Sequence, residues 1–169
     1  FLSLAKGTSS SYTDYYQVLL DGATGQEVLK DSIGVLQFAS GNAIDLNNDG
    51  RDEAILSVNY MQSGTWKHRL EVFDFVAHTI QPLLPQQTGV NIGATPLFTN
   101  LDNDNLLDLV YLVKKDSLNP MGWKGVYLNR VELSVGFPNA GLAWASYLST
   151  QNNGVYFNQT TNCGPGSIL

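Results

Sequence analysis

Short apolar runs alternate with polar turn segments along most of the chain. The clearest apolar runs have the length and side-chain types of β-strands: 54–58, 69–76, 109–113 and 125–133. The segments between them are rich in Gly, Pro, Asn and Ser, as turns are: 62–64, 82–88 and 119–122. The pattern predicts two successive units of about four short strands each.

The two ends of the chain have the pattern of half units. Residues 15–20 and 26–29 are predicted strands, joined by a tight turn over 21–25, as in the outer half of a unit. Near the other end, 142–148 and 154–157 are predicted to be the opening strands of a further unit. Residues 1–169 are expected to form one repeat domain. Its expected parts are a half unit at 12–34, whole units at 35–86 and 87–138, and a half unit with a tail at 139–169.

Two acidic segments precede the runs 54–58 and 109–113, and they match at an offset of 55 residues. Side-chain oxygens occupy the first, third, fifth and ninth places of both segments: Asp45, Asn47, Asp49 and Glu53, then Asn100, Asp102, Asp104 and Asp108. The sixth place holds Gly50 or Asn105, residues that tolerate a positive φ. We therefore expect each segment to form a tight loop between the first two strands of its unit.

Alternating carboxylates and amides in a tight loop suit a hard divalent cation. Calcium takes about six to eight oxygen ligands and tolerates irregular geometry. We predict one Ca²⁺ in each loop, bound by the eight side chains above and by the backbone carbonyls of Arg51 and Leu106. Without a cation the carboxylates repel one another, so a metal-free loop is expected to be poorly ordered. The competing interpretation is a pair of ordinary acidic β-turns, because Asp, Asn and Gly are common turn residues.

A helix–loop–helix calcium motif is a second alternative for these loops. Its loop opens with the same Asp-x-Asn-x-Asp-Gly pattern but needs an acidic bidentate ligand at the twelfth place. Here the twelfth place holds Leu56 in the first loop and Tyr111 in the second. The residues that follow each loop also suit a strand better than a helix, so the sequence excludes this motif.

The two acidic loops resemble a known family of calcium loops. Asp-x-Asn-x-Asp-Gly-x-x-Glu at 45–53 and Asn-x-Asp-x-Asp-Asn-x-x-Asp at 100–108 are similar to the loops of FG-GAP/VCBS repeats. Such repeats build integrin α-subunit propellers and many secreted bacterial proteins. Residues 20–25 resemble an outer hairpin of these blades, and 143–147 with 153–157 resemble a segment of bacterial surface proteins of this type. The departures are Glu53 for Asp, Asn100 for Asp, and Asn105 for Gly.

This resemblance implies an all-β fold, a β-propeller-like array of four-stranded antiparallel blades. It implies calcium in the loop between the first and second strands of each blade. It also implies an extracellular or cell-surface location, where millimolar Ca²⁺ suits sites of modest affinity. A closed propeller needs at least about four blades. The chain supplies about three, two whole and a half at each end, so we expect it not to close a ring by itself.

Composition narrows the classes of partner. The net charge is −6 and the isoelectric point is about 4.6, which disfavours nucleic acids and anionic membranes because both would repel the protein. No apolar run approaches the roughly 20 residues that span a bilayer, and we expect a secreted piece processed or excised from a precursor. The only cysteine, Cys163, has no internal disulfide partner. Asn158 begins an N-glycosylation sequon, which a glycosylating host would use.

No catalytic motif is present in the sequence. His68 and His78 lie apart and have no nucleophilic residue beside them. We therefore expect a non-enzymatic calcium-binding module that acts in adhesion, matrix or filament assembly. Its expected partners are further copies of itself, which would complete the half units, or the remainder of a larger propeller. A protein or glycan ligand is a further candidate.

Two alternative functions remain open at this point. One is the ancillary propeller of a secreted enzyme that acts on polysaccharide, because both ends of the chain look excised. The other is a calcium-dependent lectin in which Trp66, Trp123 and Trp144 stack on sugar rings. The more common place for such residues is the core or the face of a strand.

Overall fold

The structure is a computed structural model that describes residues 2–8, 11–32, 39–138 and 142–147. Over these residues the chain is all-β, as predicted: its strands form three antiparallel sheets, and no sheet closes into a barrel. No helix in this part of the chain is long and apolar enough to cross a membrane. The predicted strand at 154–157, Asn158 and Cys163 lie outside the described residues.

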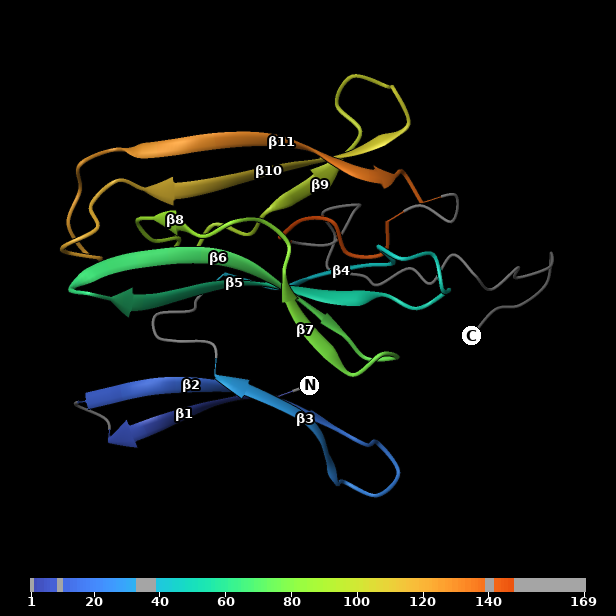
Figure 1. Cartoon of the computed structure of the whole chain (residues 1–169), viewed down its shortest axis with the longest axis horizontal. Helices are drawn as coiled ribbons and strands as arrows, with labels where there is room; N and C mark the ends of the chain where they lie inside the picture. Colours follow the sequence, from blue (N-terminus) through green and yellow to red (C-terminus); the bar gives the residue numbers. More distant parts are fainter. Residues whose placement is uncertain (1, 9–10, 33–38, 139–141, 148–169) are drawn as a thin grey trace.

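The three sheets follow one another along the chain (Figure 1). The first contains β1 Leu2–Thr8, β2 Ser11–Leu20 and β3 Glu27–Ser32. The second contains β4 Asn42–Ile44, β5 Glu53–Gln62, β6 Thr65–Asp74, β7 Thr79–Pro82 and β8 Gln87–Thr88. The third contains β9 Leu97–Thr99, β10 Leu106–Lys114 and β11 Val126–Gly136. In the second sheet, β7 and β8 both pair with β6.

The first predicted unit has its four strands in order, β4 to β7, and the acidic loop lies between the first two. The β5–β6 connection is the tight turn expected at 62–64, in which Ser63 and Gly64 have φ values of 51° and 73°. The second predicted unit, 87–138, contains four strands: β9, β10 and β11 form the third sheet, and β8 pairs with β6 of the second sheet. The first sheet includes β1 as well as the expected hairpin, where Asp21 accepts the amide N–H groups of Ala23 and Thr24.

The second sheet lies between the other two and packs against both of them (Figure 1). Successive side chains of a strand point to opposite faces. On β5, Ile55 therefore enters a core shared with Phe98 and Leu109 of the third sheet. Leu56 enters a second cluster, on which Leu29 of β3 packs. Both faces of the second sheet are thus buried, and the three sheets form one stacked unit.

Backbone hydrogen bonds also connect the second and third sheets. Trp144 exchanges two with Ala43 of β4, each 3.1 Å long, and the carbonyl of Ala145 accepts the Phe98 N–H at 2.9 Å. The predicted segment 142–148 is thus held between the first strands of two sheets, although its described part is an isolated bridge rather than a strand. Directly after β8, Gly89 has a φ of +118°, and a Cβ there would lie 2.2 Å from the Lys114 carbonyl oxygen. This close approach requires glycine.

Candidate metal centres at the acidic loops

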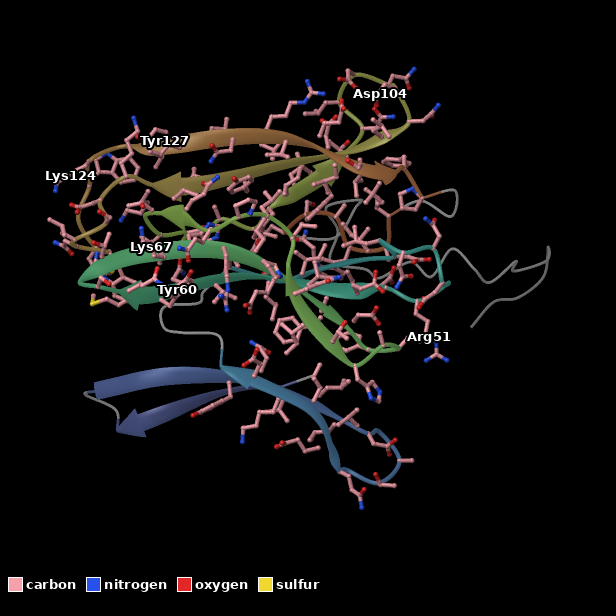
Figure 2. All side chains as sticks on the ribbon, in the orientation of Figure 1. Arg51, Tyr60, Lys67, Asp104, Lys124 and Tyr127 are labelled. Atoms are coloured by element: carbon pink, nitrogen blue, oxygen red, sulfur yellow. The ribbon has the colours of Figure 1, made fainter. Side chains whose placement is uncertain are left out.

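The two acidic loops have the same backbone shape. The first joins β4 to β5 and the second joins β9 to β10, and both lie at the same end of the sheets, marked by Arg51 and Asp104 in Figure 2. The predicted positive φ at the sixth place is confirmed: 88° at Gly50 and 68° at Asn105. The fourth places, Asn48 and Asn103, also have positive φ, at 60° and 64°. The sequence signal for this positive φ is the asparagine at the fourth place of both loops, because asparagine tolerates that conformation.

Hydrogen bonds within the loops recur at the same offset of 55 residues. The ninth-place carboxylate accepts the amide N–H of the second place at 2.7 Å in both loops: Leu46 to Glu53 and Leu101 to Asp108. The fifth-place carboxylate accepts the seventh-place N–H at 2.9 Å in the first loop and 2.8 Å in the second: Arg51 to Asp49 and Leu106 to Asp104. The sequence repeat is therefore a repeat of local structure.

The first loop brings its three predicted carboxylate ligands together. Carboxylate oxygens of Asp45, Asp49 and Glu53 lie within 4.8 Å of one another. Asn47 joins the same cluster through its amide nitrogen, which lies 3.2 Å from Glu53 Oε1, while its oxygen accepts the Asp49 N–H at 2.9 Å. The Arg51 side chain is exposed and projects away from the loop (Figure 2).

Asp74, at the end of β6, is a further acidic residue at the first loop, and sequence reasoning missed it. Its Oδ2 accepts a 3.3 Å hydrogen bond from the Asn47 amide nitrogen. Its Oδ1 accepts the N–H groups of Val76 and Ala77 in the following turn. Asp74 comes beside Glu53 because Ala54 and Phe73 are paired on β5 and β6. The sequence pattern carries no such pairing, so it could not reveal this residue.

Glu53 is a buried carboxylate at the first loop, close to three other acidic side chains. The side chain is 3 % exposed, and burial raises its pKa to about 7. The nearby negative charges of Asp74, Asp45 and Asp49 raise this pKa further, whereas the hydrogen bond from the Leu46 N–H lowers it. Within the described part of the chain, no Lys or Arg side chain forms an ion pair with these four carboxylates. The donors fit calcium, which binds carboxylate and amide oxygens and would neutralise this charge.

The second loop gathers a different set of residues. Carboxylate oxygens of Asp102, Asp104 and Glu132 lie within 4.8 Å of one another. Glu132, on β11 opposite Asp108, was not predicted, and it occupies the position that Asp74 has at the first loop. The charge of Asp104 raises the pKa of the Glu132 carboxyl. At the first place of this loop, Asn100 Oδ1 accepts the N–H groups of Asn103 and Asp104 at 2.7 and 3.3 Å.

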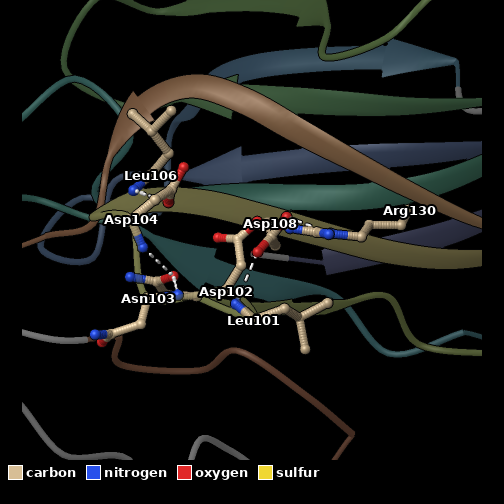
Figure 3. Close-up of polar contacts among 8 residues, drawn as sticks. Leu101, Asp102, Asn103, Asp104, Leu106, Asp108 and Arg130 are labelled. Atoms are coloured by element: carbon tan, nitrogen blue, oxygen red, sulfur yellow. Dashed lines mark hydrogen bonds and ion pairs between the residues drawn. The ribbon is translucent and has the colours of Figure 1, made fainter.

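Asp108 is turned toward a side-chain cation. Its Oδ1 accepts a 2.8 Å hydrogen bond from Arg130 Nε, and Arg130 Nη2 pairs with Asp102 (Figure 3). The hydrogen bond from Arg130 lowers the pKa of Asp108, which is 1 % exposed. Glu53 and Asp108 thus occupy the same place in two matching loops, and their pKa values shift in opposite directions.

The structure corrects one expectation about the histidines. Sequence spacing left His68 without a nucleophilic neighbour, yet Ser57 Oγ lies 2.8 Å from His68 Nε2. Both residues are 1 % exposed, and the His68 ring lies 6.1 Å from that of Tyr111, measured between centroids. The pair is therefore a hydrogen bond within the core. Burial lowers the pKa of His68 to about 4.

We expect acid to destabilise the fold through His68. Its pKa is lower in the folded chain than the unfolded value of 6.5, so its contribution is complete above pH 6.5 and is lost as the pH falls toward 4. The loss amounts to about 3 kcal/mol at most. Urea unfolding at pH 7 and pH 4.5 should show a smaller difference in His68→Gln than in the wild type. His78→Asn, at an exposed turn, should keep the wild-type difference. Equal differences in wild type and His68→Gln would contradict this assignment.

The tryptophans do not share one environment. Trp66 is 8 % exposed, and its backbone N–H donates to the Ser117 carbonyl at 2.7 Å. Trp123 is 74 % exposed and lies in the β10–β11 connection, where Lys114 Nζ is 5.7 Å from its ring centroid. Of the two, only Trp123 could present a ring to an external ligand.

Comparison with known proteins adds no relative to this description: no family model, no curated protein and no solved structure matches the chain.

Proposed function

We propose that this protein is a non-enzymatic, calcium-binding structural module of the extracellular FG-GAP/VCBS type, and that calcium is held by the first acidic loop. The observation that supports this most is the cluster of Asp45, Asp49, Glu53 and Asp74. Oxygens of Asp45, Asp49 and Glu53 lie within 4.8 Å of one another, and Asp74 joins them through its hydrogen bond from Asn47. Glu53 is buried, and no Lys or Arg side chain of the described residues pairs with any of the four. Such a cluster is costly unless a cation neutralises it.

The calcium ligands in this proposal come from the loop and from the strand beside it. Asp45, Asp49 and Glu53 would supply carboxylate oxygens, with the amide of Asn47 and the backbone carbonyl of Arg51. Asp74 would supply a further carboxylate from β6. A bound Ca²⁺ provides charge neutralisation and ties the β4–β5 connection to the end of β6. Its role is therefore to order the fold at this end of the second sheet.

The propeller interpretation is supported by the way the sheets repeat. The second and third sheets each start with a short strand, an acidic loop and a long strand, and they pack face to face. In the described residues, the outer edges of β3 and β11 have no paired strand. Open edges favour pairing with another chain. We therefore propose self-association, or joining to further blades, as the way in which the array is completed.

Calcium titration by calorimetry tests the first loop. Each of Glu53→Gln and Asp49→Asn removes one charged ligand and keeps the side-chain shape. Losing a charged calcium ligand costs at least as much as losing a hydrogen bond to a charged group, about 1.5–3 kcal/mol, so we expect binding to weaken by at least about 10- to 100-fold. Asp21→Asn is the matched control, since Asp21 is an exposed aspartate at the turn of the first sheet. Unchanged affinity in both loop variants would reject the site.

A further inference from the structure

Unlike the first loop, the second loop has a side-chain cation of its own. Arg130 Nε donates to Asp108 Oδ1 at 2.8 Å, and Arg130 Nη2 pairs with Asp102. The guanidinium therefore links the third and ninth places of the second loop (Figure 3). At the first loop the corresponding places, Asn47 and Glu53, make a hydrogen bond with each other and no ion pair within the described residues.

The position of Arg130 is fixed by the pairing of strands. Val110 on β10 pairs with Arg130 on β11, two residues along from the pair of Asp108 and Glu132. In the second sheet the equivalent pair is Ile55 with Val72. Val72 is 4 % exposed and enters the core shared with the third sheet. The same place in two repeats thus holds an apolar core residue beside the first loop and a guanidinium beside the second.

We propose that Arg130 takes the place of calcium at the second loop: its guanidinium pairs with Asp102 and Asp108, holds this loop in place and keeps a metal ion out, so that the chain binds calcium at the first loop alone. The inference rests on the proposed function of the first loop. It narrows the sequence prediction of two ions to one. Arg130 then makes the second loop independent of calcium, while the first loop depends on it.

Geometry and charge favour the guanidinium over a free ion here. Asp108 is 1 % exposed, and its Oδ1 accepts a hydrogen bond from a cation, Arg130, whereas the donors to Glu53 at the first loop, the Leu46 N–H and the Asn47 amide, are neutral. A calcium ion bound to Asp108 would lie beside the Arg130 guanidinium, and the two cations would repel each other. A guanidinium fixed to β11 also loses no translational freedom on pairing, whereas a free ion does. First-place Asn100 has no charge to compensate, since its amide is neutral.

The test is the number of calcium ions bound, measured by calorimetry and equilibrium dialysis with calcium chloride. We expect one ion for the wild type and two for Arg130→Val, which copies the residue of the second sheet. Arg130→Met serves as a second variant that keeps the length of the side chain, and circular dichroism checks that both fold. Arg130→Lys keeps a cation and should stay at one ion. Lys30→Ala, which removes an exposed cation of the first sheet, should also stay at one ion.

A second readout separates this inference from the function proposed for the first loop. In chelator, Arg130→Val should melt below the wild type, and calcium should restore it. In the double variant Asp45→Asn with Asp49→Asn, we expect no bound calcium ion. When Arg130→Val is added to that double variant, we expect one bound calcium ion. If only the Arg130 variants bind an ion, the inference stands and the first-loop proposal fails. Two ions in the wild type, or no gain of an ion in both Arg130→Val and Arg130→Met, would overturn the inference.

Discussion

Replacing Phe98 with Ala is expected to lower the free energy of unfolding by about 3–5 kcal/mol. The Phe98 side chain is 1 % exposed and belongs to the core shared by the second and third sheets, with Ile44, Leu109 and Leu142. Truncation at this place leaves a cavity between two sheets whose backbones are also fixed by strand pairing. Since a domain of this kind is stable by about 5–15 kcal/mol, the change removes a large fraction of the total.

Urea unfolding followed by fluorescence and circular dichroism measures this loss. Leu128→Ala is the matched control, because Leu128 is on β11 of the same third sheet and is 73 % exposed. Its expected cost is below about 0.5 kcal/mol. Both signals should move together in Phe98→Ala if the sheets unfold as one unit. Comparable costs for the two substitutions would mean that the second and third sheets do not share a core.

The parts of the fold that follow from local chemistry could be predicted. Short apolar runs and turn residues located β5, β6, β10 and β11, and the Asp21 turn located the hairpin of β2 and β3. Boundaries were less certain: β6 begins at Thr65, four residues before the predicted run at 69–76, because Trp66 and His68 alternate inward within a polar stretch. Strand β1 was missed, although Leu2 and Leu4 alternate with smaller or polar residues.

The set of side chains that converge at each acidic loop could be predicted only in part. Side chains within one loop, such as Asp45 and Asp49, are neighbours in sequence, so their spacing predicted that they converge. Asp74, Glu132 and Arg130 arrive from the third strand of each sheet, and the register of a hairpin brings them there. One residue of slip would turn each of them to the opposite face. Register depends on turn geometry and on packing between sheets, which the pattern of apolar runs and turn residues does not reveal.

The calcium site that we propose in the first loop predicts that stability depends on calcium. A ligand that binds the folded state alone, at about 100 times its dissociation constant, stabilises that state by about 2.7 kcal/mol. For a domain of this size each kcal/mol shifts the melting temperature by about 2–4 °C. We therefore expect chelation to lower the melting temperature of the wild type by about 5–10 °C. The physical reason is that the carboxylates of Asp45, Asp49, Glu53 and Asp74 then repel one another without a cation.

The double variant of Asp45→Asn with Asp49→Asn is the matched control for this prediction. It removes two of the four negative charges and keeps the size and the turn-forming character of both side chains. Its melting temperature should be the same with calcium and with chelator. In chelator it should melt no lower than the wild type, because the remaining carboxylates repel one another less.

The most direct test of the account is therefore a pair of thermal melts, in calcium and in excess chelator, of the wild type and this double variant, with size followed by light scattering. The account predicts a drop of about 5–10 °C for the wild type alone, with smaller species in chelator if calcium also supports self-association. Identical melting temperatures of the wild type in calcium and in chelator would contradict it, and the first loop would then be an ordinary acidic turn.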